Sequence, residues 1–175
     1  GAENMNEVIC RFIELAGKKP GFTLIHSAGI EGYEKMVEHL RRTVPDYEKN
    51  GMDVREYIYD MPRVMAAADL VLCRAGASTI SELTYMHKPT IFVPSPFVTN
   101  NHQFKNAKVV EDAGGALIFE EGWFEPKELL KAVNDILSSD DKLEKMSAAM
   151  AKLAKPEATD MICDRIFSLL AENRK

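Results

Sequence analysis

The residues best suited to chemistry lie between Gly76 and Glu82. Small residues flank Gly76, so a ligand could approach the backbone closely there. Ser78 and Thr79 follow, and Glu82 comes three positions after Thr79, which is the spacing of a Thr-x-x-Glu helix start. The unpaired amides and positive dipole end of such a helix favour an anion, typically a phosphate. The same residues also fit a helix that is merely capped by its own side chains, so both interpretations stay open here.

The elements on either side of this segment would position it. The apolar run from Leu70 to Cys73 predicts a short buried strand, and Ile80, Leu83 and Met86 have the spacing of a helix. The segment therefore predicts a strand, a tight turn of small residues and a helix.

The rest of the chain alternates apolar runs with amphipathic stretches, which predicts an α/β fold. We expect a Rossmann-like, mostly parallel sheet with helices on both faces. Strands are expected at 22–25, 70–73, 90–94 and 116–119. Residues 52–58 are expected to form either a strand throughout or a strand followed by a loop. Helices are expected at 5–15, 31–43, 62–68, 102–113, 126–137, 142–153 and, as a terminal helix, 156–172. Inward-facing positions are expected at Met36, Val37, Leu40, Met146, Met150, Met161, Ile162, Ile166 and Leu169.

Ligands of such folds bind outside the carboxyl ends of the strands. Four loops qualify on this criterion, at 26–29, 57–61, 74–79 and 95–103. Much of the polar chemistry of the chain falls in these loops or at the helix starts that follow them. This clustering is the main argument from the residues for a single site at one edge of the sheet.

Composition limits the classes of protein. The chain has 175 residues, 46% of them hydrophobic, and a net charge of -5, which fits one soluble domain and argues against nucleic acid as the main partner. The three cysteines are scattered without metal-binding spacing, which favours buried thiols in a reducing compartment. No apolar run reaches about 18 residues, so no membrane span is expected. Acidic pairs such as Glu120-Glu121 and Asp140-Asp141 are expected on solvated faces.

Several segments together resemble one family. They are DLVLCRAGASTISE (69–82), KPTIFVPSP (88–96), NHQFKNA (101–107), VREYI with the following Asp60-Met61 (54–61), and GAENMN (1–6). Their order and spacing are similar to those of the MurG family of bacterial N-acetylglucosaminyltransferases, which make lipid II. The resemblance covers nearly all of residues 1–175, but only the carboxyl half of the family's two-domain architecture.

The resemblance implies one half of a GT-B glycosyltransferase, the domain that binds the donor UDP-N-acetylglucosamine. Glu82 would accept hydrogen bonds from the two ribose hydroxyls, for which a carboxylate has two suitable oxygens. Thr79 and the helix-start amides would bind the diphosphate. The other implied donor-binding residues are Gly76, Ala77, Ser78, His102 and Gln103, the last two at the N-acetylglucosamine ring, and Tyr57, Ile58 and Met61 at the uracil.

Arg74 and Asn101 would contact the donor-binding residues and not the donor itself. For Arg74 a purely structural ion pair is equally open. The chain also departs from the family's pattern: Ser27 replaces a usual Gln, so no ligand role is carried over to it. Ser78 stands where many members have Leu, which would alter packing against the donor sugar.

The resemblance also places some functions outside this chain. The sequence starts Gly1-Ala2-Glu3 without Met, and we expect it to be part of a longer polypeptide whose amino-terminal domain binds lipid I and carries the general base. Donor binding, but not transfer, is therefore expected of these residues alone. No bound cofactor or metal is expected. The full-length protein is expected to be cytoplasmic and peripheral on the inner face of the cell membrane, in peptidoglycan synthesis.

Three alternatives remain open from the sequence. The chain could belong to another UDP-sugar transferase. It could be an epimerase of UDP-N-acetylglucosamine, although the sugar-side loops offer no extra acid. It could also be a non-catalytic nucleotide-sugar-binding subunit that needs a partner chain.

Overall fold

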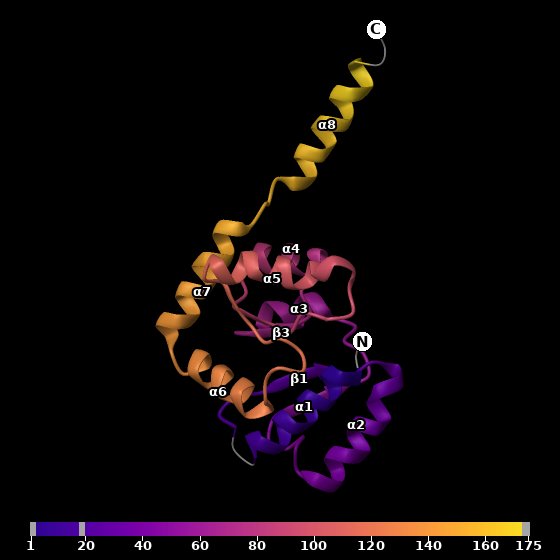
Figure 1. Ribbon diagram of the computed structural model, residues 1–175, viewed down its shortest axis with the longest axis vertical. Helices are drawn as coiled ribbons and strands as arrows, with labels where there is room; N and C mark the ends of the chain where they lie inside the picture. The colour runs from indigo at the N-terminus through magenta and orange to yellow at the C-terminus, as the bar shows by residue number, and fades with distance from the viewer. Residues whose placement is uncertain (1–2, 18–19, 173–175) are drawn as a thin grey trace.

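Parallel strand pairing organises the chain, as the computed structural model shows for residues 3–17 and 20–172 (Figure 1). The predicted α/β class is confirmed. The strands are β1 (Leu24–Ser27), β2 (Met52–Arg55), β3 (Val71–Cys73), β4 (Thr90–Phe92) and β5 (Ala116–Ile118).

The strands form two hydrogen-bonded groups, β1-β2 and β3-β4-β5, where the sequence predicted one sheet. No strand pairing joins β1 or β2 to β3, β4 or β5 among the described residues. Helices and side chains therefore connect the two groups.

The helices pack in two sets, one on each strand group, which meet where α6 contacts α7. The helices are α1 (Glu3–Ala16), α2 (Ile30–Thr43), α3 (Met61–Ala67), α4 (Ala77–Tyr85), α5 (His102–Asp112), α6 (Pro126–Leu137), α7 (Asp140–Leu153) and α8 (Ala158–Glu172), with a short 3-10 turn η1 (Thr99–Asn101). Helix α1 packs against α2 and α6, while α4 packs against α5 and α7. Figure 1 shows α4 and α5 beside β3, and α1 and α2 at the opposite end of the body.

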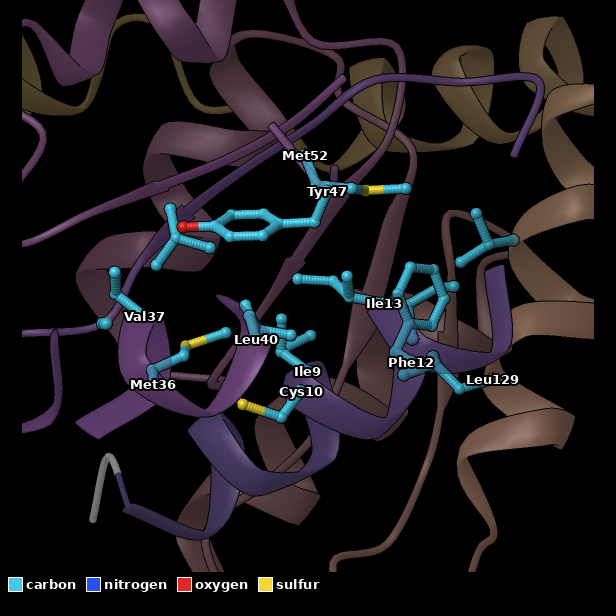
Figure 2. Close-up of a cluster of buried hydrophobic side chains, with 14 of the residues drawn as sticks. Ile9, Cys10, Phe12, Ile13, Met36, Val37, Leu40, Tyr47, Met52 and Leu129 are labelled. Atoms are coloured by element: carbon cyan, nitrogen blue, oxygen red, sulfur yellow. The ribbon is translucent and has the colours of Figure 1, made fainter. Parts of the chain in front are cut away.

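The larger apolar core lies among α1, α2, α6 and the β1-β2 pair (Figure 2), and it reaches β4 through Ile91 and α7 through Met146. Helix α1 contributes Ile9, Phe12 and Ile13 at the i, i+3, i+4 spacing of one face. The inward positions predicted in α2, including the fully buried Leu40, are confirmed. Each such side chain stabilises the fold by about 1.5–3 kcal/mol relative to exposure. A second cluster, which includes Met150, joins α4, α5 and α7 to β3, β4 and β5.

Most helix boundaries agree with the sequence prediction to within two residues. Helix α6 has the predicted bounds, with a proline in its first turn and a capping box between Glu125 and Glu128. Helix α7 begins earlier than predicted, because Ser139 caps it by accepting a hydrogen bond from the Lys142 amide. Strand β1 is shifted by two residues, so His26 belongs to the strand and not to the loop.

The inward positions predicted in α8 are wrong. Met161, Ile162, Ile166 and Leu169 are 41–65% exposed. Their helical spacing is real, but α8 extends away from the body and its described residues are all exposed (Figure 1). Cys163 on the same helix is exposed too, contrary to the expectation of buried thiols, whereas Cys10 is buried. In the part of the chain that the structure describes, no helix has the length and apolar content to cross a membrane.

Removal of residues 156–175 should therefore leave the thermal midpoint within about 2 °C of the whole chain, a change of under about 1 kcal/mol in a domain of this size. Circular dichroism melting would measure this. Leu40→Ala is the positive control, with an expected loss of about 2–5 kcal/mol for a fully buried leucine. If removing α8 lowered the stability as much as Leu40→Ala does, the conclusion that α8 does not pack on the body would be contradicted.

Candidate functional site

The four segments predicted as loops lie at carboxyl ends of parallel strands, although the first, 26–29, begins with the last two residues of β1. In the first strand group, the amide of Ala28 donates to the Arg55 carbonyl at 2.8 Å, and the amide of Gly29 donates to the Glu56 carbonyl at 3.0 Å. The loop after β1 is thus joined to the chain leaving β2. This brings the segments 26–29 and 57–61 to one edge.

A similar set of contacts joins the loops of the second strand group. The Val93 amide donates to the Cys73 carbonyl at 2.9 Å, and Arg74 Nη1 donates to the Val93 carbonyl at 2.9 Å. From α5, the Asn106 side chain donates to the Ala75 carbonyl at 3.4 Å. The chain leaving β3 is therefore held against both β4 and α5.

The beginning of α1 links the two groups. Asn4 Nδ2 donates to Glu121 Oε1 at 2.6 Å, and Glu121 forms an ion pair with Arg74. Two residues further along, Asn6 Nδ2 donates to the Ala28 carbonyl at 2.8 Å. Side chains of a single helix turn thus contact the carboxyl edges of both strand groups.

Helix α4 begins earlier than the predicted capping box requires, so that prediction is wrong. Gly76 is the N-cap in an extended conformation, and its carbonyl accepts from the Ile80 amide at 2.9 Å. Thr79 is therefore already the third helical residue, and Glu82 lies too far along the helix to reach the first turn. No side chain caps α4. The first-turn amides consequently keep their capacity to bind an anion.

Other residues expected around this helix lie on its surface. Ala77, Ser78 and Glu82 are exposed, while Leu83 and Thr84 form the buried face of α4. The Glu82 carboxylate is thus presented to solvent from the middle of the helix.

The loop before α5 combines unusual backbone conformations with directed polar groups. Asn100 and Asn101 have left-handed φ values of 55° and 52°, which non-glycine residues adopt seldom and asparagine most readily. His102 Nδ1 donates to the Thr99 carbonyl at 3.0 Å, which in the neutral ring leaves Nε2 as an acceptor. Gln103 Oε1 accepts from the Ser95 amide at 2.9 Å, so its amide nitrogen is the group able to donate to a ligand.

The expected nucleobase residues follow β2. The Ile58 side chain is buried, so only its backbone can face a ligand, while Tyr57 and Met61 are exposed. Tyr59, which the sequence analysis did not single out, packs edge-on against Tyr57 with ring centroids 5.0 Å apart. The structure thus adds an aromatic partner beside Tyr57.

Glu121 is a residue that sequence reasoning missed. It was expected on a solvated face, but its side chain is only 9% exposed and it pairs with Arg74, which is 24% exposed. Burial by itself would raise the pKa of Glu121, but hydrogen bonds from Arg74 and Asn4 and the Arg74 charge outweigh it and lower that pKa. Its place just after β5, at the carboxyl edge, was the signal that could have identified it.

The buried Asn6 and the partly buried His26 form a polar pair beside this edge. Because Asn6 donates through its nitrogen to a carbonyl, its oxygen must accept from His26 Nε2, at 2.8 Å. Burial lowers the pKa of His26 to about 4, so the ring is neutral near pH 7. Gly32 leaves room for this pair, since a Cβ there would lie 2.2 Å from Asn6 Nδ2.

Two other kinds of feature, groups of possible metal ligands and surface hollows, do not coincide with the expected site. Residues 3–17 and 20–172 contain no group of three histidine, cysteine or acidic side chains arranged for a metal ion. An open hollow of about 440 Å³ is lined by residues 122–125, 127 and 128, between β5 and α6, and includes none of the expected site residues.

The His26 pair predicts a pH-dependent stability. His26 has a lower pKa in the folded chain than its ordinary 6.5, so its contribution is present above pH 6.5 and is lost as the pH falls towards 4. Between pH 7 and pH 5 this loss should be about 2 kcal/mol. Urea unfolding at both pH values, compared with His26→Gln, would measure it. An equal pH dependence in both proteins would contradict the assignment.

Comparison with known proteins gives the family. The model of the glycosyltransferase family 28 C-terminal domain matches residues 1–162. UDP-N-acetylglucosamine--N-acetylmuramyl-(pentapeptide) pyrophosphoryl-undecaprenol N-acetylglucosamine transferases from Caldicellulosiruptor saccharolyticus and Desulforudis audaxviator are 39% and 35% identical, over 93% and 100% of this chain. Only 43% and 47% of those relatives are covered, so the chain spans somewhat less than half of their length.

Solved structures agree with this result. The crystal structure of Acinetobacter baumannii MurG matches with a TM-score of 0.81 and 28% identity, over 96% of this chain and 49% of that one. A Staphylococcus aureus MnaA–UDP co-structure matches with a TM-score of 0.66 at 15% identity, which shows a shared fold only. Since the family model matches almost the whole sequence, the chain belongs to glycosyltransferase family 28, as its C-terminal domain.

Proposed function

We propose that this chain binds UDP-N-acetylglucosamine as the donor half of an inverting glycosyltransferase that converts lipid I to lipid II in peptidoglycan synthesis. The observation that carries the proposal is the match, along nearly the whole chain, to relatives named as transferases of that sugar. The expected contact residues also follow the carboxyl ends of parallel strands, where α/β folds bind ligands.

The proposed roles follow from the chemistry of each group. The exposed Glu82 carboxylate accepts hydrogen bonds from both ribose hydroxyls. The uncapped first turn of α4, residues 77–79, binds the diphosphate. His102 Nε2 accepts from a sugar hydroxyl and the Gln103 amide nitrogen donates to one. The Ile58 backbone contacts uracil beside Tyr57 and Met61.

The proposed catalytic contribution of the chain is stabilisation of the leaving group. When the sugar transfers, negative charge develops on the departing UDP, and fixed backbone amides at the start of α4 would stabilise that charge without a metal ion. Inversion also needs an acceptor hydroxyl aligned on the opposite face and a base beside it. We assign the base, the lipid I site and attachment to the cytoplasmic face of the membrane to the rest of the longer protein.

An epimerase is less well supported, although proteins with that name share the fold at low identity. Epimerisation needs catalytic carboxylates that reach the sugar ring, and residues 95–103 contain no Asp or Glu. Glu121 lies near the same edge, but it is engaged by Arg74 and Asn4.

Glu82→Ala should weaken UDP-N-acetylglucosamine binding by about 1.5–3 kcal/mol, because it removes a charged acceptor from two hydroxyls. Isothermal titration calorimetry of the wild type and variant would measure this. The matched control is Glu144→Ala, which removes an exposed glutamate of α7 and should leave the affinity unchanged.

The choice of ligand tests the rest of the proposal. UDP-glucose, UDP-N-acetylgalactosamine and ADP-glucose should each bind more weakly than UDP-N-acetylglucosamine. Tighter binding of another nucleotide sugar would contradict the assigned donor, and an unchanged affinity in Glu82→Ala would contradict the assigned ribose contact.

A further inference from the structure

We propose that Glu121 is a positioning residue for the donor site, which acts through Arg74 and Asn4 to fix the start of α1 against the loops after β3 and β4. The inference rests on the proposed function, because it takes the ligand of this edge to be a nucleoside diphosphate sugar. Glu121 lies outside every motif on which the family resemblance was based.

The two oxygens of Glu121 have different partners. Oε1 accepts from Asn4 in the first turn of α1, at 2.6 Å, and Oε2 forms the ion pair with Arg74. Asn4 and Glu121 are 117 residues apart in the sequence. One carboxylate therefore joins the beginning of the described chain to the segment that follows β5.

Arg74 extends the connection to β4 and α4. Its Nη1 donates to the carbonyl of Val93, which directly follows β4, at 2.9 Å. Arg74 itself directly follows β3 and comes two residues before Gly76, the N-cap of α4. A single ion pair thus connects the starts of α1 and α4 with the ends of β3 and β4.

Because the Glu121–Arg74 ion pair is largely shielded from solvent, it restrains the segments that it joins more strongly than an exposed ion pair does. Glu121 and Arg74 are 9% and 24% exposed, whereas Lys145 and Asp141 on α7 are 75% and 71% exposed. Solvent and salt screen the exposed pair, which leaves it weak. Loss of one partner from the shielded pair leaves the other charge poorly solvated, so the surrounding segments must rearrange.

Loss of the Glu121–Arg74 ion pair would affect some parts of the donor more than others, because each part contacts a different segment. The diphosphate and sugar would contact the start of α4 and the loop before α5, both of which are connected through Arg74. The uracil would contact Ile58 on the other strand group, and the ribose would contact Glu82 within α4. A displaced loop therefore harms the diphosphate-sugar end most, because binding there needs several groups to be aligned at once.

Glu121→Gln tests this, since it removes the charge and keeps the size of the side chain. UDP-N-acetylglucosamine affinity should fall about tenfold, as for the loss of one charge-assisted hydrogen bond. Uridine affinity, measured by NMR titration, should stay within about twofold of the wild type. The control is Glu111→Gln on the last turn of α5, which disrupts a carboxylate pair with Lys108 and a contact to the Ile118 amide. It should change neither affinity.

A second readout needs no ligand. Backbone amide order parameters at residues 4–6, 95, 97 and 98 should fall in Glu121→Gln from about 0.85 to below about 0.6, and should not fall in Glu111→Gln. Unchanged order parameters, or an equal loss of uridine and UDP-N-acetylglucosamine affinity, would overturn the positioning role. Absence of any uridine nucleotide binding by the wild type would overturn the proposed function instead, and the order parameters would then decide the role of Glu121 alone.

Discussion

The attachment of the first turns of α1 is the constraint on which the arrangement of the site depends. Asn4 contacts Glu121, which pairs with Arg74 of the second strand group, and Asn6 contacts the Ala28 carbonyl of the first. The described β1 and β3 are not hydrogen-bonded to each other, so strand pairing does not fix one group against the other. Side-chain contacts from α1, together with the apolar core beneath it, supply that connection.

This constraint explains why polar groups are buried beside a site that is itself exposed. His26, Asn6 and Glu121 are largely shielded from solvent. Asn6 is hydrogen-bonded to His26 and to the Ala28 carbonyl, while Glu121 is bonded to Asn4 and Arg74, and these contacts hold the loop ends in place. The groups proposed to contact the ligand, such as Glu82 and His102, remain exposed. The left-handed conformations of Asn100 and Asn101, which asparagine adopts more readily than most residues, shape the exposed loop directly before His102 and Gln103.

Much of the fold could be predicted from the sequence, because apolar spacing and helix boundaries are local. The α6 bounds and the buried face of α2 are examples. The errors came from tertiary context. The apolar residues of α8 have the right period, but nothing in the described chain packs on them, and the helical start at Ala77 overrode the Thr79–Glu82 spacing. Glu121 could not be assigned from a local pattern, since its partners are more than 40 residues away in sequence.

The most direct test of the central claim is to locate where the donor binds by NMR titration. Amide chemical shifts of the isotope-labelled chain would be followed as UDP-N-acetylglucosamine is added. The account predicts that the largest changes occur at Ile58, at residues 76–79 and at His102 and Gln103, on both sides of the first turn of α1. Changes confined to the hollow at residues 122–128, or the absence of saturable changes at the carboxyl edge, would contradict it.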